Sequence, residues 1–254
     1  MYNDLFTVFG LTVHGYGLMI GLGVLAALWM GCARAKSRGL SDDTAATLVL
    51  LAVIIGFVGA KIFFVLTHFP DFLRDPLGSL GSEGFVVYGG IIFGALACFV
   101  WLRLRKQSFL IWADILMPGV ALAQGLGRVG CFLAGCCYGR PALRCWGVVF
   151  PAGSMAPAGI PLIPTQLYSA AGDVLLCLTL LIYDRKKHTD GGVLALYLIL
   201  YSIGRFLIEF LRNDARGSVG VLSASQFIGL FVLTGAVVFA LVLRGKAGKK
   251  GETP

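Results

Sequence analysis

The strongest constraint on this chain is a series of long apolar segments. Each holds close to 20 residues with few charges, and they cover 13–33, 45–67, 85–102, 110–127, 165–183, 192–211 and 223–243. A helix rises 1.5 Å per residue, so about 20 residues cross a hydrocarbon layer roughly 30 Å thick. Charged residues make up only 13% of the chain, against roughly 25% in soluble domains. The sequence therefore predicts an all-α polytopic membrane protein with about seven transmembrane helices.

The fourth apolar segment is the weakest of the series. It contains Asp114, Pro118 and Gln124. Proline lacks the backbone donor of a helical residue and clashes with the preceding turn. We therefore expect this span to be kinked or partly unwound.

Basic residues occur in every second connection. They follow the first, third, fifth and seventh spans, as Arg34, Lys36 and Arg38, then Arg103, Arg105 and Lys106, then Arg185, Lys186 and Lys187, then Arg244, Lys246, Lys249 and Lys250. Basic loops stay in the cytoplasm, so the N-terminus is expected outside and the C-terminus inside. The net charge of +8 then suits anionic lipid rather than nucleic acid. We expect a single transmembrane domain over 1–254, with outward excursions at 68–84 and 128–164.

With this orientation, the unusual polar residues of the spans all fall near the outer face. They are Tyr16, Lys61, Tyr88, Arg128, Tyr201, Arg205, Glu209 and Arg212. Charged side chains inside a membrane mostly face the bundle interior or a wet cavity. The pattern predicts a site for a phospholipid head group in the outer leaflet.

The sixth span allows two interpretations. Tyr201, Arg205 and Glu209 are spaced i, i+4 and i+8, so they share one helix face with Arg212 at i+11. Arg205 and Glu209 could form a structural ion pair that locks helices together. Alternatively, Arg205 and Arg128 could clamp a phosphate, because the planar guanidinium fork donates two hydrogen bonds at once and stays charged.

The seven cysteines divide into two groups. We expect Cys32, Cys98 and Cys177, in or beside spans, to be small apolar fillers. The outward loop region holds Cys131, Cys136, Cys137 and Cys145, where a structural disulfide is the leading interpretation. A catalytic thiol, Cys136, is the alternative. Zinc is disfavoured by the atypical spacing and the absence of a nearby histidine, so neither a metal nor a cofactor is expected. The histidines at span edges, His14, His68 and His188, form no constellation.

Several short motifs, taken together, carry a family resemblance. They are Tyr16-Gly17-Leu18-Met19, Gly59-Ala60-Lys61, Tyr88-Gly89-Gly90, Gly127-Arg128-Val129-Gly130 with Gly139, Pro164-Thr165-Gln166-Leu167-Tyr168, and the run from Tyr201 through Arg205 and Glu209 to Arg212. In these motifs, and over nearly its whole length, the chain resembles the prolipoprotein diacylglyceryl transferases of bacterial cytoplasmic membranes.

The chain departs from that family at several polar positions. Tyr88 stands where the family has histidine, and Lys61 where it usually has arginine. In the signature loop, Cys131 and Ala134 replace asparagines and Cys136 replaces a glutamate. Ile163 replaces a histidine before Pro164, and Ser169 replaces a glutamate after Tyr168. The arginine framework remains while several acid–base groups do not.

The resemblance implies transfer of the diacylglyceryl group of phosphatidylglycerol to the thiol of a lipobox cysteine in a lipoprotein precursor, at the outer leaflet. It implies catalytic roles for Arg128, Arg205, Tyr88 and Cys136. It also implies substrate contacts for Tyr16, Lys61, Gly89, Gly90, Gly130, Gly139, Gln166, Tyr168, Tyr201, Glu209 and Arg212. Tyrosine titrates near pH 10, so Tyr88 is a poor base for a thiol.

Two functional classes stay open on the sequence. The first is a lipid-modifying transferase that performs the family reaction or a variant with another lipid or acceptor. The second is a non-catalytic membrane protein that binds lipid or exchanges thiols. Release of glycerol phosphate from labelled phosphatidylglycerol, or complementation of a transferase-deficient strain, distinguishes the two.

Overall fold

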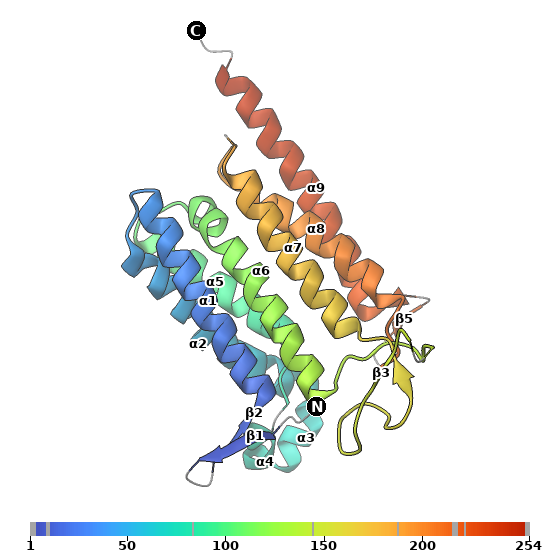
Figure 1. Cartoon of the computed structure of the whole chain (residues 1–254). Coiled ribbons are helices and arrows are strands. Elements are labelled where there is room, and N and C mark those ends of the chain that lie inside the picture. Colours follow the sequence, from blue (N-terminus) through green and yellow to red (C-terminus); the bar gives the residue numbers. More distant parts are fainter. Residues whose placement is uncertain are drawn as a thin grey trace. The chain divides into compact units, whose positions relative to one another are not determined.

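Seven long apolar helices dominate the described part of the chain. The computed structural model describes residues 4–8, 11–82, 84–143, 145–186, 188–214, 218–220 and 222–251 (Figure 1). The helices able to cross a membrane by length and composition are α1 (Gly15–Ser37), α2 (Asp42–Thr67), α5 (Val87–Leu104), α6 (Phe109–Ala134), α7 (Thr165–Asp184), α8 (Gly192–Glu209) and α9 (Ala224–Gly251). Each overlaps one predicted span, so the polytopic α-helical class is confirmed.

Short elements occupy the connections. The first hairpin pairs β1 (Asp4–Val8) with β2 (Leu11–His14), and the sequence analysis did not predict it. Segment 68–84 contains α3 (Phe69–Arg74) and α4 (Pro76–Gly81). Two more antiparallel pairs join β3 (Val148–Val149) to β4 (Pro161–Leu162), and β5 (Ser218–Val219) to β6 (Leu222–Ser223).

The chain forms two compact units, and each is described on its own. The first comprises residues 1–30 and 113–254, and the second comprises residues 31–112. In the second unit α2 packs on α5 through glycines: a Cβ on Gly89 would lie 2.5 Å from the Gly59 carbonyl oxygen, and one on Gly90 would lie 3.1 Å from that of Gly56. Small residues let two helix backbones approach closely in a membrane.

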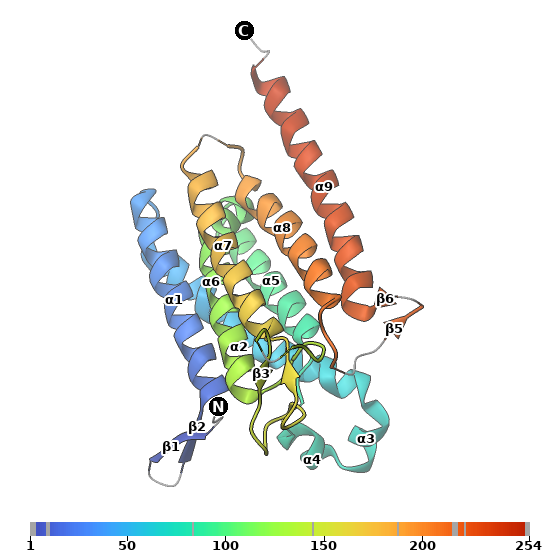
Figure 2. The same cartoon turned by 45° about the vertical axis from the view of Figure 1, so that its right-hand side comes forward.

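In the first unit α7, α8 and α9 run alongside one another (Figures 1 and 2). Its core includes Leu176 and Leu180 of α7 together with Val193 and Tyr197 of α8, all buried. A smaller core of Phe150, Ala156 and Leu162 lies under the loop that follows α6. Segment 141–163 is therefore a packed excursion, held by its own apolar side chains.

Helix α6 shows that the fourth span, expected to be kinked or partly unwound, is not unwound. It is continuous from Phe109 to Ala134, with Pro118 inside it. Its polar side chains bond to α8 instead: the backbone N–H groups of Gly191 and Leu194 donate to the Asp114 carboxylate at 2.7 and 2.8 Å. The Tyr197 hydroxyl donates to Gln124 at 2.8 Å. These bonds satisfy polar groups that would otherwise cost free energy in the bilayer.

One histidine does belong to a polar cluster, contrary to expectation. At the connection between α7 and α8, His188 Nε2 lies 3.1 Å from the Asp184 carboxylate, and its Nδ1 lies 3.9 Å from that of Asp114. Asp114 precedes Arg128 by 14 residues of one helix, a rise of about 21 Å. The cluster therefore joins the start of α8 to α6 and α7 and lies far from Arg128.

Candidate functional site

A cavity of about 450 Å³ lies between α7 and α8. Apolar side chains of both helices form most of its wall. Its polar lining comprises Arg128 of α6, Tyr168, Ser169, Asp173 and Thr179 of α7, and Tyr201 and Arg205 of α8. The two arginines that the sequence analysis combined into a clamp thus line one cavity.

The contacts of Arg205 are compatible with both interpretations of the sixth span, the structural ion pair and the phosphate clamp. Its Nη1 donates to the Glu209 carboxylate at 2.6 Å, and its Nη2 donates to the Ser225 hydroxyl of α9 at 2.9 Å. The ion pair therefore exists, yet the same guanidinium lines the cavity. An arginine has five N–H donors, so those not bonded to Glu209 and Ser225 can serve a ligand.

Arg128 differs from Arg205 in its bonding. It is half-buried, and its guanidinium makes no hydrogen bond to another residue in the described part of the chain. The nearby groups that act on its charge include Tyr201 and Asp173. A guanidinium that lines a cavity and makes no hydrogen bond to the protein is suited to bind an anion such as phosphate.

Asp173 is the cavity residue that the sequence analysis missed. It is 7% exposed, lines the cavity, and lies within electrostatic range of both Arg128 and Arg205. The available signal was a lone carboxylate in the middle of a span, which by itself indicates a functional site. Asp173 follows Ser169 by four residues, one helical turn after the position where the resembling family has a glutamate.

The end of α8 is fixed by a second arginine. Arg212 donates two hydrogen bonds to Asp214, at 3.0 and 2.8 Å, and lies 3.9 Å from Glu209. Arg212 also lies within hydrogen-bonding reach of the Cys137 thiol. Glu209 and Arg212 therefore form an ionic border between α8 and the loop that follows α6, rather than part of the cavity wall.

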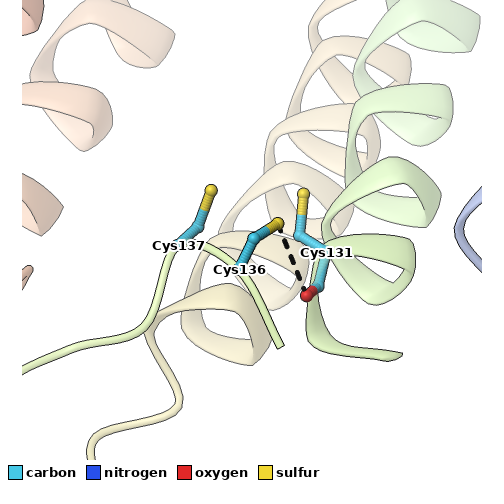
Figure 3. Close-up of side chains that lie close together, drawn as sticks. All are labelled: Cys131, Cys136 and Cys137. Atoms are coloured by element: carbon cyan, nitrogen blue, oxygen red, sulfur yellow. Dashed lines mark hydrogen bonds between the residues drawn. The ribbon is translucent and has the colours of Figure 1, made fainter. Parts of the chain in front are cut away.

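Three cysteines of that loop region converge. Cys131 lies in the last turns of α6, and Cys136 and Cys137 follow its end; their sulfur atoms all lie within 4.8 Å of one another. Figure 3 shows the three sulfurs pointing to the same side. All seven cysteines lie in the described residues and each is a thiol, so the expected disulfide is not formed. Hydrogen bonding to the neighbouring thiols of Cys131 and Cys137 raises the pKa of Cys136.

The first turn of α7 holds this cysteine turn in place. The Thr165 hydroxyl donates to the Cys137 carbonyl at 2.7 Å, and the Gln166 amide donates to the Cys136 carbonyl at 2.6 Å. Cys137 adopts a left-handed conformation, with φ of 63°, which non-glycine residues rarely adopt. Among the described residues, Gln166 Oε1 is the one buried side-chain nitrogen or oxygen atom with no hydrogen-bond partner.

Two glycines expected at the site have close packing roles. A Cβ on Gly130 would lie 3.1 to 3.3 Å from Met19 and Tyr16, so this glycine lets α6 approach the start of α1. A Cβ on Gly139 would lie within 2.8 Å of the Ile163 and Leu211 carbonyl oxygens. Gly139 thereby joins the loop after α6 to both β4 and the end of α8.

The remaining predicted residues belong to the second unit. Lys61 donates to the Ser82 carbonyl at 2.6 Å and the Gly84 carbonyl at 3.3 Å, and its ammonium lies over the Phe64 and Phe85 rings. Tyr88 is 40% exposed. Gly89 and Gly90 form the close contact with α2 described above. Roles of these residues in substrate binding or catalysis stay predictions.

An apolar groove adjoins the cavity. Its volume is about 440 Å³, and it is lined by Leu122, Gly125, Leu126 and Val129 of α6 and by Ala170, Ala171, Val174 and Leu175 of α7. Leu175 borders both spaces, and Val129 follows Arg128 directly. The cavity thus carries charged groups, and the groove is lined by apolar residues.

Fold and site thus define a multi-pass membrane protein with a cavity lined by two arginines among its helices. The family model of prolipoprotein diacylglyceryl transferase matches residues 3–242. The chain is 45% identical over 246 residues to phosphatidylglycerol–prolipoprotein diacylglyceryl transferase 2 of Clostridium perfringens, covering 96% of each chain. It is 44% identical over 238 residues to the Clostridium tetani transferase, covering 92% of this chain and 95% of that one. The chain belongs to the prolipoprotein diacylglyceryl transferase family.

Proposed function

We propose that this protein transfers the diacylglyceryl group of phosphatidylglycerol to the cysteine thiol of a lipoprotein precursor. The thiol sulfur forms a bond to the glyceryl carbon as the bond from that carbon to the phosphate oxygen breaks. Glycerol phosphate leaves with the bonding electron pair, and a thioether remains on the acceptor. The family and its similar relatives support this reaction.

The observation that carries the proposal is the bonding of Arg128. It lines the cavity with a guanidinium that makes no hydrogen bond within the described residues. A charge in that position needs an anionic ligand, since desolvating it without acceptors is costly. The phosphodiester of phosphatidylglycerol supplies one. Arg128 and Arg205 then stabilise the charge that develops on the leaving phosphate, the role of preorganised donors in catalysis.

The apolar groove between α6 and α7 takes an acyl chain. Its lining shares Leu175 with the cavity, and Val129 in that lining follows Arg128 directly, which supports an acyl chain in the groove of a lipid whose phosphate lies at Arg128. Asp173, near both arginines, offsets part of their charge and so keeps the cavity from holding phosphate too tightly for product release.

We place the cavity at the outer leaflet of the bacterial cytoplasmic membrane. The alternating basic connections support this orientation, with the N-terminus outside and the C-terminus inside. Lipoprotein precursors present their lipobox cysteine on that side after export. Segment 141–163 follows the end of α6 closely in the sequence, and we place the approach of the acceptor lipoprotein beside it.

Complementation of a conditional transferase-deficient strain tests the proposal. The wild-type chain should restore growth and the lipid-modified form of a reporter lipoprotein, and Arg128→Ala should not, at equal protein level. Growth without modified lipoprotein would point to bypass instead of transfer. A stable, membrane-inserted wild-type chain that restores neither would contradict the proposal and favour a non-catalytic lipid-binding role.

A further inference from the structure

The three converging cysteines offer metal-binding thiols, which have no role in phosphate binding by the two arginines. Four zinc–sulfur bonds of about 2.3 Å at tetrahedral angles place sulfurs roughly 3.8 Å apart. The Sγ atoms of Cys131, Cys136 and Cys137 lie within 4.8 Å of one another and point to the same side (Figure 3). The three sulfurs therefore lie close to the separation that one zinc ion requires.

The backbone around the cysteines is held from outside the trio. Thr165 and Gln166 of α7 bind the carbonyls of Cys137 and Cys136 at 2.7 and 2.6 Å. Cys131 is fixed by its place in α6 and is buried. Groups that orient ligands in this way raise metal affinity, because less order must be gained on binding.

The charges near the trio suit an anionic metal–thiolate centre. Three thiolates and one divalent cation carry a net charge of −1. Arg128 lies within electrostatic range of Cys131 and Cys137, and Arg212 is within hydrogen-bonding reach of Cys137. Both arginines compensate the charge of the centre, which a low-dielectric membrane site requires.

The proposed reaction lacks a means of forming the acceptor thiolate. A free thiol with a pKa near 8.5 is mostly protonated at pH 7, and the thiolate is the nucleophile. Tyr88 occupies the place of the family's histidine, and a tyrosine hydroxyl is a weaker base than an imidazole. A thiol bound to zinc is deprotonated outright.

We propose that Cys131, Cys136 and Cys137 bind a zinc ion whose fourth ligand is the cysteine thiolate of the acceptor lipoprotein. Three protein ligands with one open position are the pattern of catalytic zinc, and soft thiolates select zinc over harder cations. This inference rests on the proposed function, because it identifies how the same site activates its second substrate.

The step balances without any redox change. The acceptor thiol releases its proton to water as its sulfur binds zinc. That sulfur then attacks the glyceryl carbon, the carbon–oxygen bond to the phosphate breaks, and glycerol phosphate leaves with the electron pair. The neutral thioether is a weaker zinc ligand than a thiolate and dissociates. Arg128 lies one helical turn before Cys131, so phosphate and thiolate meet at neighbouring positions of α6.

Metal analysis and cobalt substitution of the purified full-length protein test the site. Zinc content should be close to one ion per chain. Cys136→Ser should lower zinc affinity by at least the 10–100-fold that loss of a supporting residue costs, whereas Cys145→Ser, an exposed cysteine outside the trio, should not. Cys136→His supplies another zinc ligand and should regain metal, which separates ligand loss from misfolding.

The Co²⁺ form reports the fourth ligand directly. Adding a peptide with a lipobox-type cysteine should strengthen the thiolate-to-cobalt absorption, and the same peptide with serine should not. Three results would each overturn the inference. They are folded protein without metal, a disulfide between two of the three thiols, and a cobalt spectrum that does not change when the cysteine peptide is added.

Transfer from phosphatidylglycerol, followed in parallel, separates this inference from the proposed function. Transfer that continues at full rate in metal-free protein overturns the zinc inference and leaves the proposed function intact. A cobalt spectrum that responds to the peptide, in protein that transfers nothing from phosphatidylglycerol, supports the zinc site and contradicts the proposed function.

Discussion

Arg128 and Arg205 carry like charges into one cavity, but the protein compensates those charges differently. Arg205 is bonded to Glu209 and Ser225, whereas the hydrogen-bond donors of Arg128 meet no acceptor within the described residues. Arg205 therefore both stabilises the structure and lines the cavity. The hydrogen-bond donors of Arg128 are available to the ligand.

Removing each arginine should reveal this difference. Arg128→Ala should lower the rate of transfer by about 10²–10³-fold with little change in the free energy of unfolding. Arg205→Ala should lower the rate similarly and also cost about 1–3 kcal/mol of stability, because buried Glu209 loses its main partner. Turnover of labelled phosphatidylglycerol and thermal unfolding in detergent measure the two effects.

Lysine at either position should also be impaired, since it lacks the bidentate fork. Arg103→Ala, at the exposed C-terminal end of α5, is the matched control for lost positive charge. Full activity in Arg128→Ala would remove this residue from the mechanism.

Tyr88 tests which group handles the acceptor proton. If the hydroxyl only orients a group, Tyr88→Phe costs one hydrogen bond, about 0.5–1.5 kcal/mol. If Tyr88 takes the proton itself, the loss is about 10²-fold or more. We expect the small effect, because the zinc site supplies the thiolate. A loss above 10²-fold in folded protein would assign the proton to Tyr88.

At the scale of elements, α7 and α8 form the cavity through small residues that face open space. Gly172 and Gly204 both line it, and a Cβ on either would meet no atom within 4 Å. These glycines weaken their helices by about 0.5–1 kcal/mol each relative to alanine. Their absence of side chains keeps the cavity wide enough for a head group.

Filling the cavity should therefore abolish binding without unfolding the protein. Gly204→Phe places an aromatic ring where the head group lies, so transfer and binding of phosphatidylglycerol should fall by at least tenfold while thermal stability holds or rises. Gly235→Phe is the matched control, since Gly235 of α9 also has open space around it but lies outside the cavity lining. Equal turnover in both variants would show that the lipid binds elsewhere.

Helix α6 illustrates what local sequence rules miss. Pro118 and Asp114, considered alone, predict a kinked or partly unwound span. In the structure Asp114 caps α8 and Gln124 accepts a hydrogen bond from Tyr197, so contacts with α8 support the helix. Such contacts between distant segments override local propensity.

At the scale of the whole molecule, hydropathy and spacing are sufficient to predict the spans and the pairing of Arg128 with Arg205 in one site. Apolar length and a shared helix face are local properties of the sequence. The convergence of Cys131 with Cys136 and Cys137 depends on how the chain turns after α6, and the role of Asp173 depends on the contact between α7 and α8. The sequence analysis therefore expected a disulfide among the four loop cysteines but not the convergence of these three thiols, and it did not single out Asp173.

The orientation of the molecule is the prediction that belongs to this scale. Basic connections predict an external N-terminus and an internal C-terminus. Reporter fusions should therefore be active as cytoplasmic markers after residues 38, 106, 186 and 250, and as external markers after residues 82 and 150. A fusion that places residue 250 outside the cytoplasm would refute the orientation and move the cavity to the inner leaflet.

The most direct measurement of the central claim is the analysis of both reaction products in defined vesicles. Purified protein is reconstituted with phosphatidylglycerol labelled in both its acyl chains and its head group, together with a lipobox cysteine peptide. We expect equal amounts of released glycerol phosphate and thioether-linked diacylglyceryl peptide, and neither with Arg128→Ala. Folded wild-type protein that yields neither product, or that releases glycerol phosphate without modifying the peptide, would contradict diacylglyceryl transfer.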